Sequence, residues 1–305
     1  MIIPNFTKEH ADKILENVNV EAIQARKFKV AVDMINASAC VMDPYLFEKL
    51  GVELIPLNNI PNGKFAHRPE PIKENLGDIA HLVKESKADL GFIHDPDADR
   101  LVIVDEKGEV ISEEYGLAFG IENVLSKNPG KTAVINLSTS QMDVDIAKKY
   151  GSNCIRTKIG EPNVVEGIIN NDGLIGGEGN GGVIYPSINL ARDSFVGLSL
   201  ILEMLAERKQ TISECVATLP KYFIKKDKWS AVGKNLNEIY SKLKSRFKNA
   251  KIDQQDGLRL DFPDSSWLHL RSSNTEPIIR LFGEAKTQER IETLFNEAKL
   301  TLNEK

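Results

Sequence analysis

Apolar residues recur at two spacings along the first third of the chain, and the two spacings alternate. Ile14, Leu15 and Val18 repeat at helical intervals after Thr7, a candidate N-cap. Runs rich in β-branched residues lie between such segments and stop at polar residues such as Asp33. We expect helices at residues 7–27, 43–50 and 76–86. We expect strands at residues 28–32, 52–57, 89–94 and 101–104. This alternation predicts a mainly parallel sheet covered by helices.

The same order of elements recurs in the middle of the chain. Residues 131–136 read as a strand that ends in a polar loop, and residues 173–176 read as a strand that runs into a glycine-rich loop. Helices are predicted between them, at residues 143–150 and 163–170. We therefore predict two similar α/β units in tandem.

The pattern changes after about residue 219. Adjacent strands are predicted at residues 257–262, 266–270 and 278–282, with helices at 236–247 and 289–302 outside them. Helices outside a run of strands indicate a small α+β domain. The sequence predicts an α/β protein: two tandem mixed-sheet α/β domains, residues 1–112 and 113–218, followed by a small α+β C-terminal domain, residues 219–305.

Composition narrows the class of protein. The chain has 305 residues, of which 41% are apolar and 27% charged, and its net charge is only −5, so nothing indicates a nucleic-acid partner. No stretch approaches the ~20 apolar residues of a membrane span. The three cysteines, Cys40, Cys154 and Cys215, are far apart and form no CxxC pair. A reducing cytoplasm is therefore expected, with neither a disulfide framework nor a zinc site.

An acidic loop follows the predicted strand at 89–94. Asp95, Asp97 and Asp99 alternate there, and Arg100 comes next. Three carboxylates so close repel one another without a cation. Mg²⁺ prefers oxygen ligands in an octahedron, so a loop that turned the three side chains inward would suit it. Arg100 supplies one further positive charge.

Three other interpretations of this acidic loop fit its residues less well. An EF-hand needs Gly at its sixth position, where Arg100 stands, and residues 101–104 read as a strand. A plain polar turn would need only Arg100 to neutralise it. A hydrolase with Asp95 as nucleophile and Asp97 as acid/base lacks the expected Gly-Thr after Asp97 and has no use for Asp99.

Two further loops have binding chemistry. Residues 176–182 hold five glycines around Glu178 and Asn180, whose side chains suit sugar hydroxyls; the alternative is a plain tight turn. Residues 271–277, Arg-Ser-Ser-Asn-Thr-Glu-Pro, precede Arg280 and offer the donors that hold a phosphate. The alternative there is a hairpin turn with an ion pair from Arg271 to Glu276.

Together the three loops resemble one family, the α-D-phosphohexomutases. Residues 95–100 are similar to the family's metal loop, 177–182 to its sugar-specificity loop and 271–277 to its last phosphate-binding loop. The resemblance covers essentially the whole chain and implies that Asp95, Asp97 and Asp99 bind Mg²⁺. Arg100 and Lys158 are its candidate catalytic residues. Its implied substrate-binding residues are Glu178, Asn180, Arg271, Ser273, Asn274, Thr275 and Arg280.

One departure from the family is large. Its catalytic phosphoserine lies in a first domain with a Ser-His-Asn-Pro segment, and no Ser-His pair occurs here. We therefore expect part of a phosphohexomutase, inactive alone, whose substrate is a hexose phosphate such as that of glucosamine, mannose or glucose. A separate chain could supply the serine, or the chain could self-associate. The alternative is a non-catalytic sugar-phosphate-binding protein.

Overall fold

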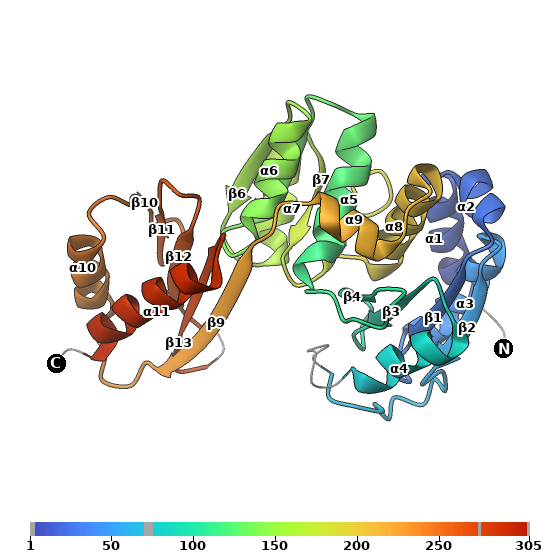
Figure 1. Ribbon diagram of the computed structural model, residues 1–305, viewed down its shortest axis with the longest axis horizontal. Helices are drawn as coiled ribbons and strands as arrows, with labels where there is room; N and C mark the ends of the chain where they lie inside the picture. The colour runs from blue at the N-terminus through green and yellow to red at the C-terminus, as the bar shows by residue number, and fades with distance from the viewer. Residues whose placement is uncertain (1–3, 70–75, 274–275, 304–305) are drawn as a thin grey trace.

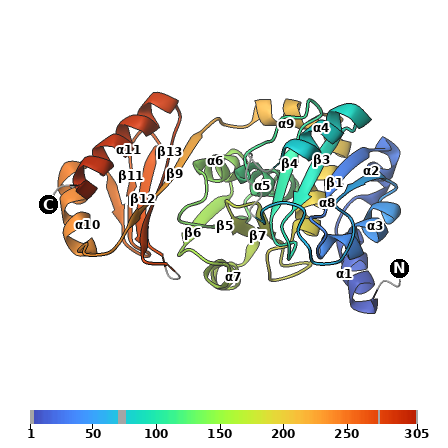
Figure 2. The same ribbon diagram turned by 90° about the horizontal axis from the view of Figure 1, so that it is seen from below.

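The computed structural model describes residues 4–69, 76–273 and 276–303, and it contains three sheets (Figure 1). The first two lie in the N-terminal two thirds of the chain, and the third forms a separate body at the C-terminal end (Figures 1 and 2). No helix in the described part of the chain is both long enough and apolar enough to cross a membrane.

The first sheet has the order β2-β1-β3-β4. Its strands are β1 (Lys29–Asp33), β2 (Glu53–Leu57), β3 (Leu90–His94) and β4 (Leu101–Val104). The first three run parallel, and β4 is antiparallel to β3 because the short loop between them reverses the chain. Helix α4 (Gly77–Ser86) covers one face. Helices α1 (Asn5–Leu15) and α3 (Ala39–Lys49) cover the other.

The second sheet repeats this topology in the order β6-β5-β7-β8. Its strands are β5 (Thr132–Asn136), β6 (Asn153–Thr157), β7 (Gly173–Glu178) and β8 (Gly182–Ile184). Again three strands are parallel and the fourth is antiparallel. Helix α7 (Glu161–Asn170) covers one face, and α6 (Gln141–Lys149) lies on the other. The predicted tandem of mixed α/β units is therefore confirmed.

Helices α5 (Glu114–Lys127) and α8 (Ser194–Arg208) join the two units. Both pack against β4 of the first sheet and β8 of the second, and α8 also packs against α2 (Val20–Arg26). Nearly every residue of α8 is buried, so one continuous apolar core runs from the first sheet to the second. This shared core fixes the two sheets relative to each other.

The third sheet is antiparallel, in the order β10-β11-β12-β13-β9. Its strands are β9 (Phe223–Ser230), β10 (Lys251–Asp253), β11 (Leu258–Asp261), β12 (Trp267–Ser272) and β13 (Ile278–Ala285). Leu260, Leu268 and Leu281 pack against α10 (Leu236–Arg246) and α11 (Gln288–Asn303) in a separate core. Because side chains alternate along a strand, the polar residues between them point to the opposite face, toward the second sheet. We call this the inner face of the third sheet; its members include Lys226, Arg259, His269, Arg271, Arg280 and Glu284.

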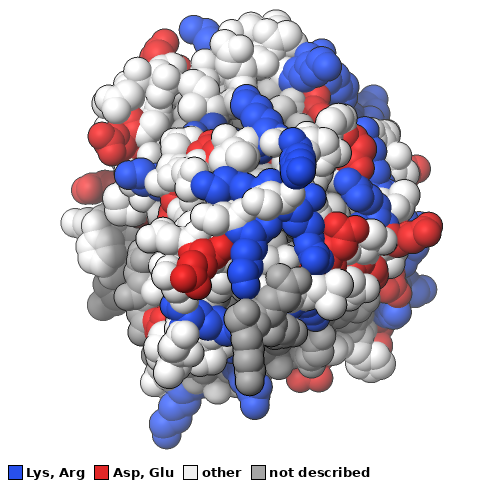
Figure 3. Space-filling view, turned by 90° about the vertical axis from the view of Figure 1, so that its left-hand side faces the viewer, with Lys and Arg blue, Asp and Glu red and all other residues white. Residues whose placement is uncertain are grey.

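The outer end of this C-terminal body is rich in Lys and Arg, with acidic residues among them (Figure 3). Helix α10, whose last turn carries Lys244 and Arg246, lies at this end.

One predicted element was wrong. Residues 7–27 form two helices, α1 and α2, because Asn19 caps a new helix by accepting the Ala22 N–H at 3.0 Å. Thr7 is buried inside α1 rather than at its N-cap position, which Pro4 occupies. The prediction also left out the elements α5, α8, α9 (Ile212–Thr218), β6, β8, β9 and β10.

Asp143 is an unusual group in the second α/β unit. It is fully buried in the first turn of α6, and neither carboxylate oxygen has a hydrogen-bond partner. Burial, opposed by Arg156 and aided by the charge of Glu284, raises the pKa of Asp143 to about 8. The folded protein therefore holds this carboxyl protonated through a pH range in which the unfolded chain ionises it.

We expect Asp143 to make stability fall with rising pH. An unfolded aspartate has a pKa of about 3.9, so its proton is lost on unfolding across roughly pH 4 to 8, and the free energy of unfolding declines there. Asp143→Asn removes this dependence. It should raise the melting temperature by several degrees at pH 8 and change it little at pH 4.5, as measured by circular dichroism. Asp172→Asn, at an exposed turn, is the control; an equal shift of melting temperature at both pH values for Asp143→Asn would contradict the prediction.

Candidate functional site

A cavity of about 250 Å³ lies where the second sheet meets the inner face of the third. Loops that follow β3, β5, β6 and β7 reach it at their carboxyl ends, the usual place for ligands in open α/β sheets. Four of its lining residues are cations, and two are acids. They are Arg100, Lys226, Arg271 and Arg280, with Glu114 and Glu178.

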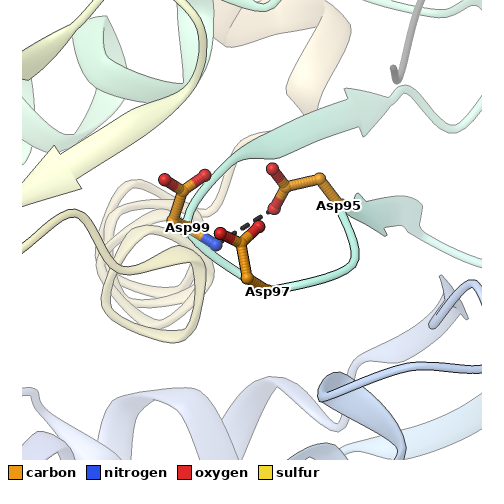
Figure 4. A group of neighbouring side chains, drawn as sticks. All are labelled: Asp95, Asp97 and Asp99. Carbon is orange, nitrogen blue, oxygen red and sulfur yellow. Dashed lines mark hydrogen bonds between the residues drawn. The ribbon is translucent and has the colours of Figure 1, made fainter. Parts of the chain in front are cut away.

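The loop between β3 and β4 turns its three aspartates toward one another (Figure 4). Asp95, Asp97 and Asp99 each offer a carboxylate oxygen, and these atoms lie within 4.8 Å of one another. The turn closes because one oxygen of Asp95 accepts the N–H groups of Asp99 and Arg100, both at 3.0 Å. Ala98 takes a left-handed conformation with φ +60° to complete it. The predicted inward turn of the loop is therefore present.

A buried polar group anchors this loop to α8. Ser194, in the first turn of α8, donates its hydroxyl to the carbonyl of Ala98 at 2.6 Å, and the ring of His94 contacts the same hydroxyl at 2.7 Å. The other ring nitrogen of His94 lies 3.1 Å from Asp43 of α3. The acidic loop is thus held between the first sheet and the helix that joins the two sheets.

The charges of the loop suit a divalent cation. Burial, a hydrogen bond with Asp99 and the charges of Asp99 and Asp97 raise the pKa of Asp95 to about 7. One oxygen of Asp99 is buried without a hydrogen-bond partner. The Nε atom of Arg100 lies 3.4 Å from both Asp95 and Asp99, so Arg100 forms an ion pair with each but no close hydrogen bond. Residues Leu101–Val104 form β4, which excludes an EF-hand.

Glu178 ends β7 and is held from two sides. One of its oxygens accepts the side-chain amide of Asn136 at 2.8 Å and the N–H of Gly160 at 2.9 Å. The other oxygen accepts from Arg192 at 2.6 Å. Asn180 also lines the cavity, and its side chain accepts the N–H of Gly182 at 3.2 Å. The glycine-rich loop is therefore a rigid wall of the cavity.

Arg192, which the sequence did not single out, connects this wall with the acidic loop. Its guanidinium contacts Asp99, Glu178 and Glu161, the last at 3.2 Å. Nothing in the sequence around Arg192 indicated this role, because its partners are 14 to 93 residues away.

The inner face of the third sheet supplies the positive side of the cavity. Arg271 and Arg280 are directly opposite each other on β12 and β13. Burial lowers the pKa of Arg271, and so does the charge of Arg280, whereas Asp256 and Glu178 raise it. The Nε atoms of both arginines are buried and find no hydrogen-bond partner in the part of the chain that the structure describes. Two crowded guanidiniums with unmet donors form a ready site for an anion.

The remaining candidate residues are those of the predicted phosphate loop and Lys158, and the structure places them as follows. Glu276 pairs with Arg280 at 3.1 Å, whereas the alternative hairpin interpretation of this loop paired Glu276 with Arg271. The N–H of Ser273 donates to the carbonyl of Ile278 at 2.9 Å. Asn274 and Thr275 lie outside the described residues. Lys158 is exposed at the end of β6 and does not line the cavity, whereas its neighbour Ile159 does.

Polar contacts join the second α/β unit to the third sheet around the cavity. Ser138 contacts His269 at 2.8 Å, and the N–H of Ile159 donates to Asp256 at 3.0 Å. Buried Glu284 accepts the hydroxyl of Ser140 at 2.5 Å. Lys226, which also lines the cavity, donates to Glu113 at 2.7 Å. Among the segments that make these contacts, the sequence analysis had indicated only the polar loop that follows residues 131–136.

Family comparisons give the same domain order as the sheets. The model described as phosphoglucomutase/phosphomannomutase, alpha/beta/alpha domain II, matches residues 8–108. The models of alpha/beta/alpha domain III and of the C-terminal domain match residues 114–223 and 225–300.

Individual relatives carry names from this family. The chain is 39% identical to a phosphoglucomutase/phosphomannomutase of Thermococcus kodakarensis, covering 94% of the chain and 63% of that protein. It is 32% identical to a probable phosphoglucosamine mutase of Methanosarcina acetivorans, covering 98% of the chain and 67% of that protein. The chain thus spans about two thirds of the length of the curated relatives it matches.

Solved structures share the fold. A phosphoglucomutase/phosphomannomutase family protein from Burkholderia thailandensis superposes with a TM-score of 0.84 at 27% identity, over 97% of this chain and 65% of that one. The N-acetylphosphoglucosamine mutase of Aspergillus fumigatus, solved with GlcNAc-6P and magnesium, gives 0.64 at 15% identity, over 97% and 68%.

Gly181 brings the glycine-rich loop against the acidic loop, and we expect its replacement to be costly. Its φ is +85°, and a Cβ there would lie 2.2 Å from the backbone oxygen of Leu101. Gly130 has nearly the same φ, +82°, with nothing within 4 Å of its Cβ position. Both Ala variants carry the left-handed penalty of about 1–2 kcal/mol. Gly181→Ala should lose about 1–3 kcal/mol more than Gly130→Ala in urea denaturation, because backbone must shift. Equal losses would contradict this reading of the contact.

Proposed function

This chain belongs to the phosphoglucomutase/phosphomannomutase family, and we propose that its cavity holds a hexose phosphate during phosphoryl transfer between the 1- and 6-positions. The observation that carries the proposal is the distribution of charge around the cavity. Three cations of the third sheet stand at one end, and a cation-suited acidic loop lies beyond Arg100 at the other. A phosphate at each end of a sugar matches this arrangement.

Arg271, Arg280 and Lys226 would hold the phosphate that does not react. Hydrogen bonds to charged groups contribute about 1.5–3 kcal/mol each, so a few suffice to hold the ligand firmly. Ser273 lies on the same hairpin, and by resemblance Asn274 and Thr275 add donors there.

Glu178 and Asn180 would contact the sugar hydroxyls, and Asn136 supports Glu178 from behind. The sugar is a hexose such as glucosamine, glucose or mannose. The glycine-rich loop favours glucosamine, and several relatives are named as probable phosphoglucosamine mutases.

Asp95, Asp97 and Asp99 would hold Mg²⁺, since they form an oxygen-only set with one unpartnered buried oxygen. When bound, the ion neutralises charge on the transferring phosphoryl group. Arg100 lines the cavity beside these aspartates and would add positive charge there. Lys158 is an exposed candidate at the rim.

The reaction also needs a nucleophile, and no Ser-His pair occurs in these 305 residues. We propose that the phosphoryl-carrying serine comes from another polypeptide segment and that this chain alone does not turn over substrate.

We further propose domains at residues 1–112, 113–218 and 219–305. The described cysteines are unpaired, which supports a cytoplasmic location. Self-association is the other proposed partnership.

Arg271→Gln tests the phosphate end of the site. Calorimetry should detect glucosamine 6-phosphate binding to the unaltered chain, and the variant should bind at least tenfold more weakly, because one charged hydrogen-bonding group is lost. Arg290→Gln removes an arginine that pairs with Asp264 on the surface and serves as the control. Micromolar binding that does not change when Mg²⁺ is added would favour a non-catalytic sugar-phosphate-binding protein. Unchanged binding by Arg271→Gln would reject the phosphate site.

Mixing this chain with a separate serine-bearing domain tests whether the nucleophile comes from a second polypeptide segment. We expect this chain, with a separately produced domain that bears the Ser-His-Asn-Pro segment, to convert glucose 1-phosphate to glucose 6-phosphate only when Mg²⁺ is present. Asp97→Asn should lower the rate at least a hundredfold, because a proposed metal ligand loses its charge. Asp78→Asn, an exposed aspartate of α4, should leave the rate unchanged. A chain that turned over substrate unaided would refute the need for a second segment.

A further inference from the structure

Arg192 contacts three loops that meet at the cavity. Its guanidinium binds Asp99 of the acidic loop and bonds Glu178 of the glycine-rich loop at 2.6 Å. Its Nε and its backbone N–H both donate to Glu161, at 3.2 and 2.9 Å. Glu161 opens α7 directly after the loop that carries Lys158. One side chain therefore links the first sheet's loop with two loops of the second sheet.

The surroundings of Arg192 are shaped to hold it in place. Its side chain is 15% exposed. Burial lowers the pKa of Arg192, but the charges of Glu178, Asp99 and Glu161 outweigh burial and raise it, so the group stays charged. The next residue, Asp193, caps α8 by accepting two N–H groups and is bonded by His10 at 2.6 Å.

Gly182 provides the space that the arginine needs. A Cβ on Gly182 would lie 2.4 Å from Cδ of Arg192 and 2.9 Å from its Cγ. Any side chain at position 182 would therefore push the arginine stem away from its present path. The glycine-rich loop and the arginine are fitted to each other.

Arg192 contacts only one of the two carboxylate oxygens of Asp99. Arg192 contacts Oδ2, whereas Oδ1 is buried, lacks a hydrogen bond among the described residues and lies 3.4 Å from the Nε atom of Arg100. A partner that binds one oxygen of a carboxylate orients the carboxylate as a metal ligand. The same guanidinium fixes Oε2 of Glu178, while Asn136 and Gly160 fix Oε1.

We propose that Arg192 is a positioning residue that sets Asp99 and Glu178 together, so that the metal loop and the sugar loop reach their binding geometry as one unit. This inference rests on the proposed function of the two loops. It requires the planar fork of arginine, because lysine presents a point charge that cannot bond three carboxylates in fixed directions.

Arg192→Lys tests the proposal, since it keeps the positive charge and removes the fork. Calorimetry on the full chain would measure Mg²⁺ binding and, separately in EDTA, glucosamine 6-phosphate binding. We expect both affinities to fall, that for Mg²⁺ by about 10–100-fold, the usual effect of losing a residue that orients a metal ligand. Arg208→Lys alters an arginine that bonds buried Glu122 at 2.9 Å on the far part of α8 and should change neither affinity.

A second variant guards against a merely misfolded protein. Gly182→Ala displaces the stem of Arg192 without changing any charge, and it should also weaken binding of both ligands. Thermal denaturation would verify that each variant is folded at the temperature of the titrations. If Arg192→Lys bound both ligands as the unaltered chain does, the role of Arg192 would be charge alone and the proposal would be overturned. If the unaltered chain bound neither ligand, the proposed function itself would fail.

Discussion

Carboxylates cannot be crowded inside a folded protein unless opposite charge lies among them, and this constraint organises the cavity. Four carboxylates converge from three loops and share two guanidiniums, those of Arg100 and Arg192; they are Asp95, Asp99, Glu161 and Glu178. Asp97 lies beside Asp95 and Asp99. Burial, together with the neighbouring Asp99 and Asp97, raises the pKa of Asp95. A divalent cation would offset the excess negative charge, in agreement with the metal site proposed for the acidic loop.

The opposite imbalance exists on the third sheet. Arg271 and Arg280 are cross-strand neighbours whose Nε atoms lack hydrogen bonds among the described residues, and Lys226 lines the same cavity. Like charges directly opposite on a sheet are destabilising unless something compensates. The two ends of the cavity therefore attract ligands of opposite charge. A metal ion at the acidic end and a sugar phosphate at the basic end would match them. This complementarity supports the proposed function more strongly than either loop does alone.

The sequence predicted what depends on local order. Strand and helix spacing revealed the tandem units, and the acidic loop was found because its three aspartates lie within five residues. It did not reveal Arg192 or Lys226, whose importance comes from partners far away in the chain. It also placed Thr7 at a helix start, where burial of Thr7 inside α1 took precedence over its capping preference. Helix α8 was left out because it is apolar on nearly all sides, so it lacks the one-sided pattern of a surface helix.

Two kinds of contact hold the parts of the cavity together. The acidic loop and the glycine-rich loop are joined through α5 and α8, whose apolar side chains form one continuous core. The third sheet has its own core and meets the second unit largely through polar contacts, such as those of His269 with Ser138 and of Glu284 with Ser140. Close packing is costly to disturb, whereas hydrogen bonds of this kind can be exchanged for bonds to water at a smaller net cost. The geometry between the acidic loop and the glycine-rich loop is therefore set by packing, and the distance to the third sheet is set by hydrogen bonds. Arg192 adds a hydrogen-bonded link between the two packed loops.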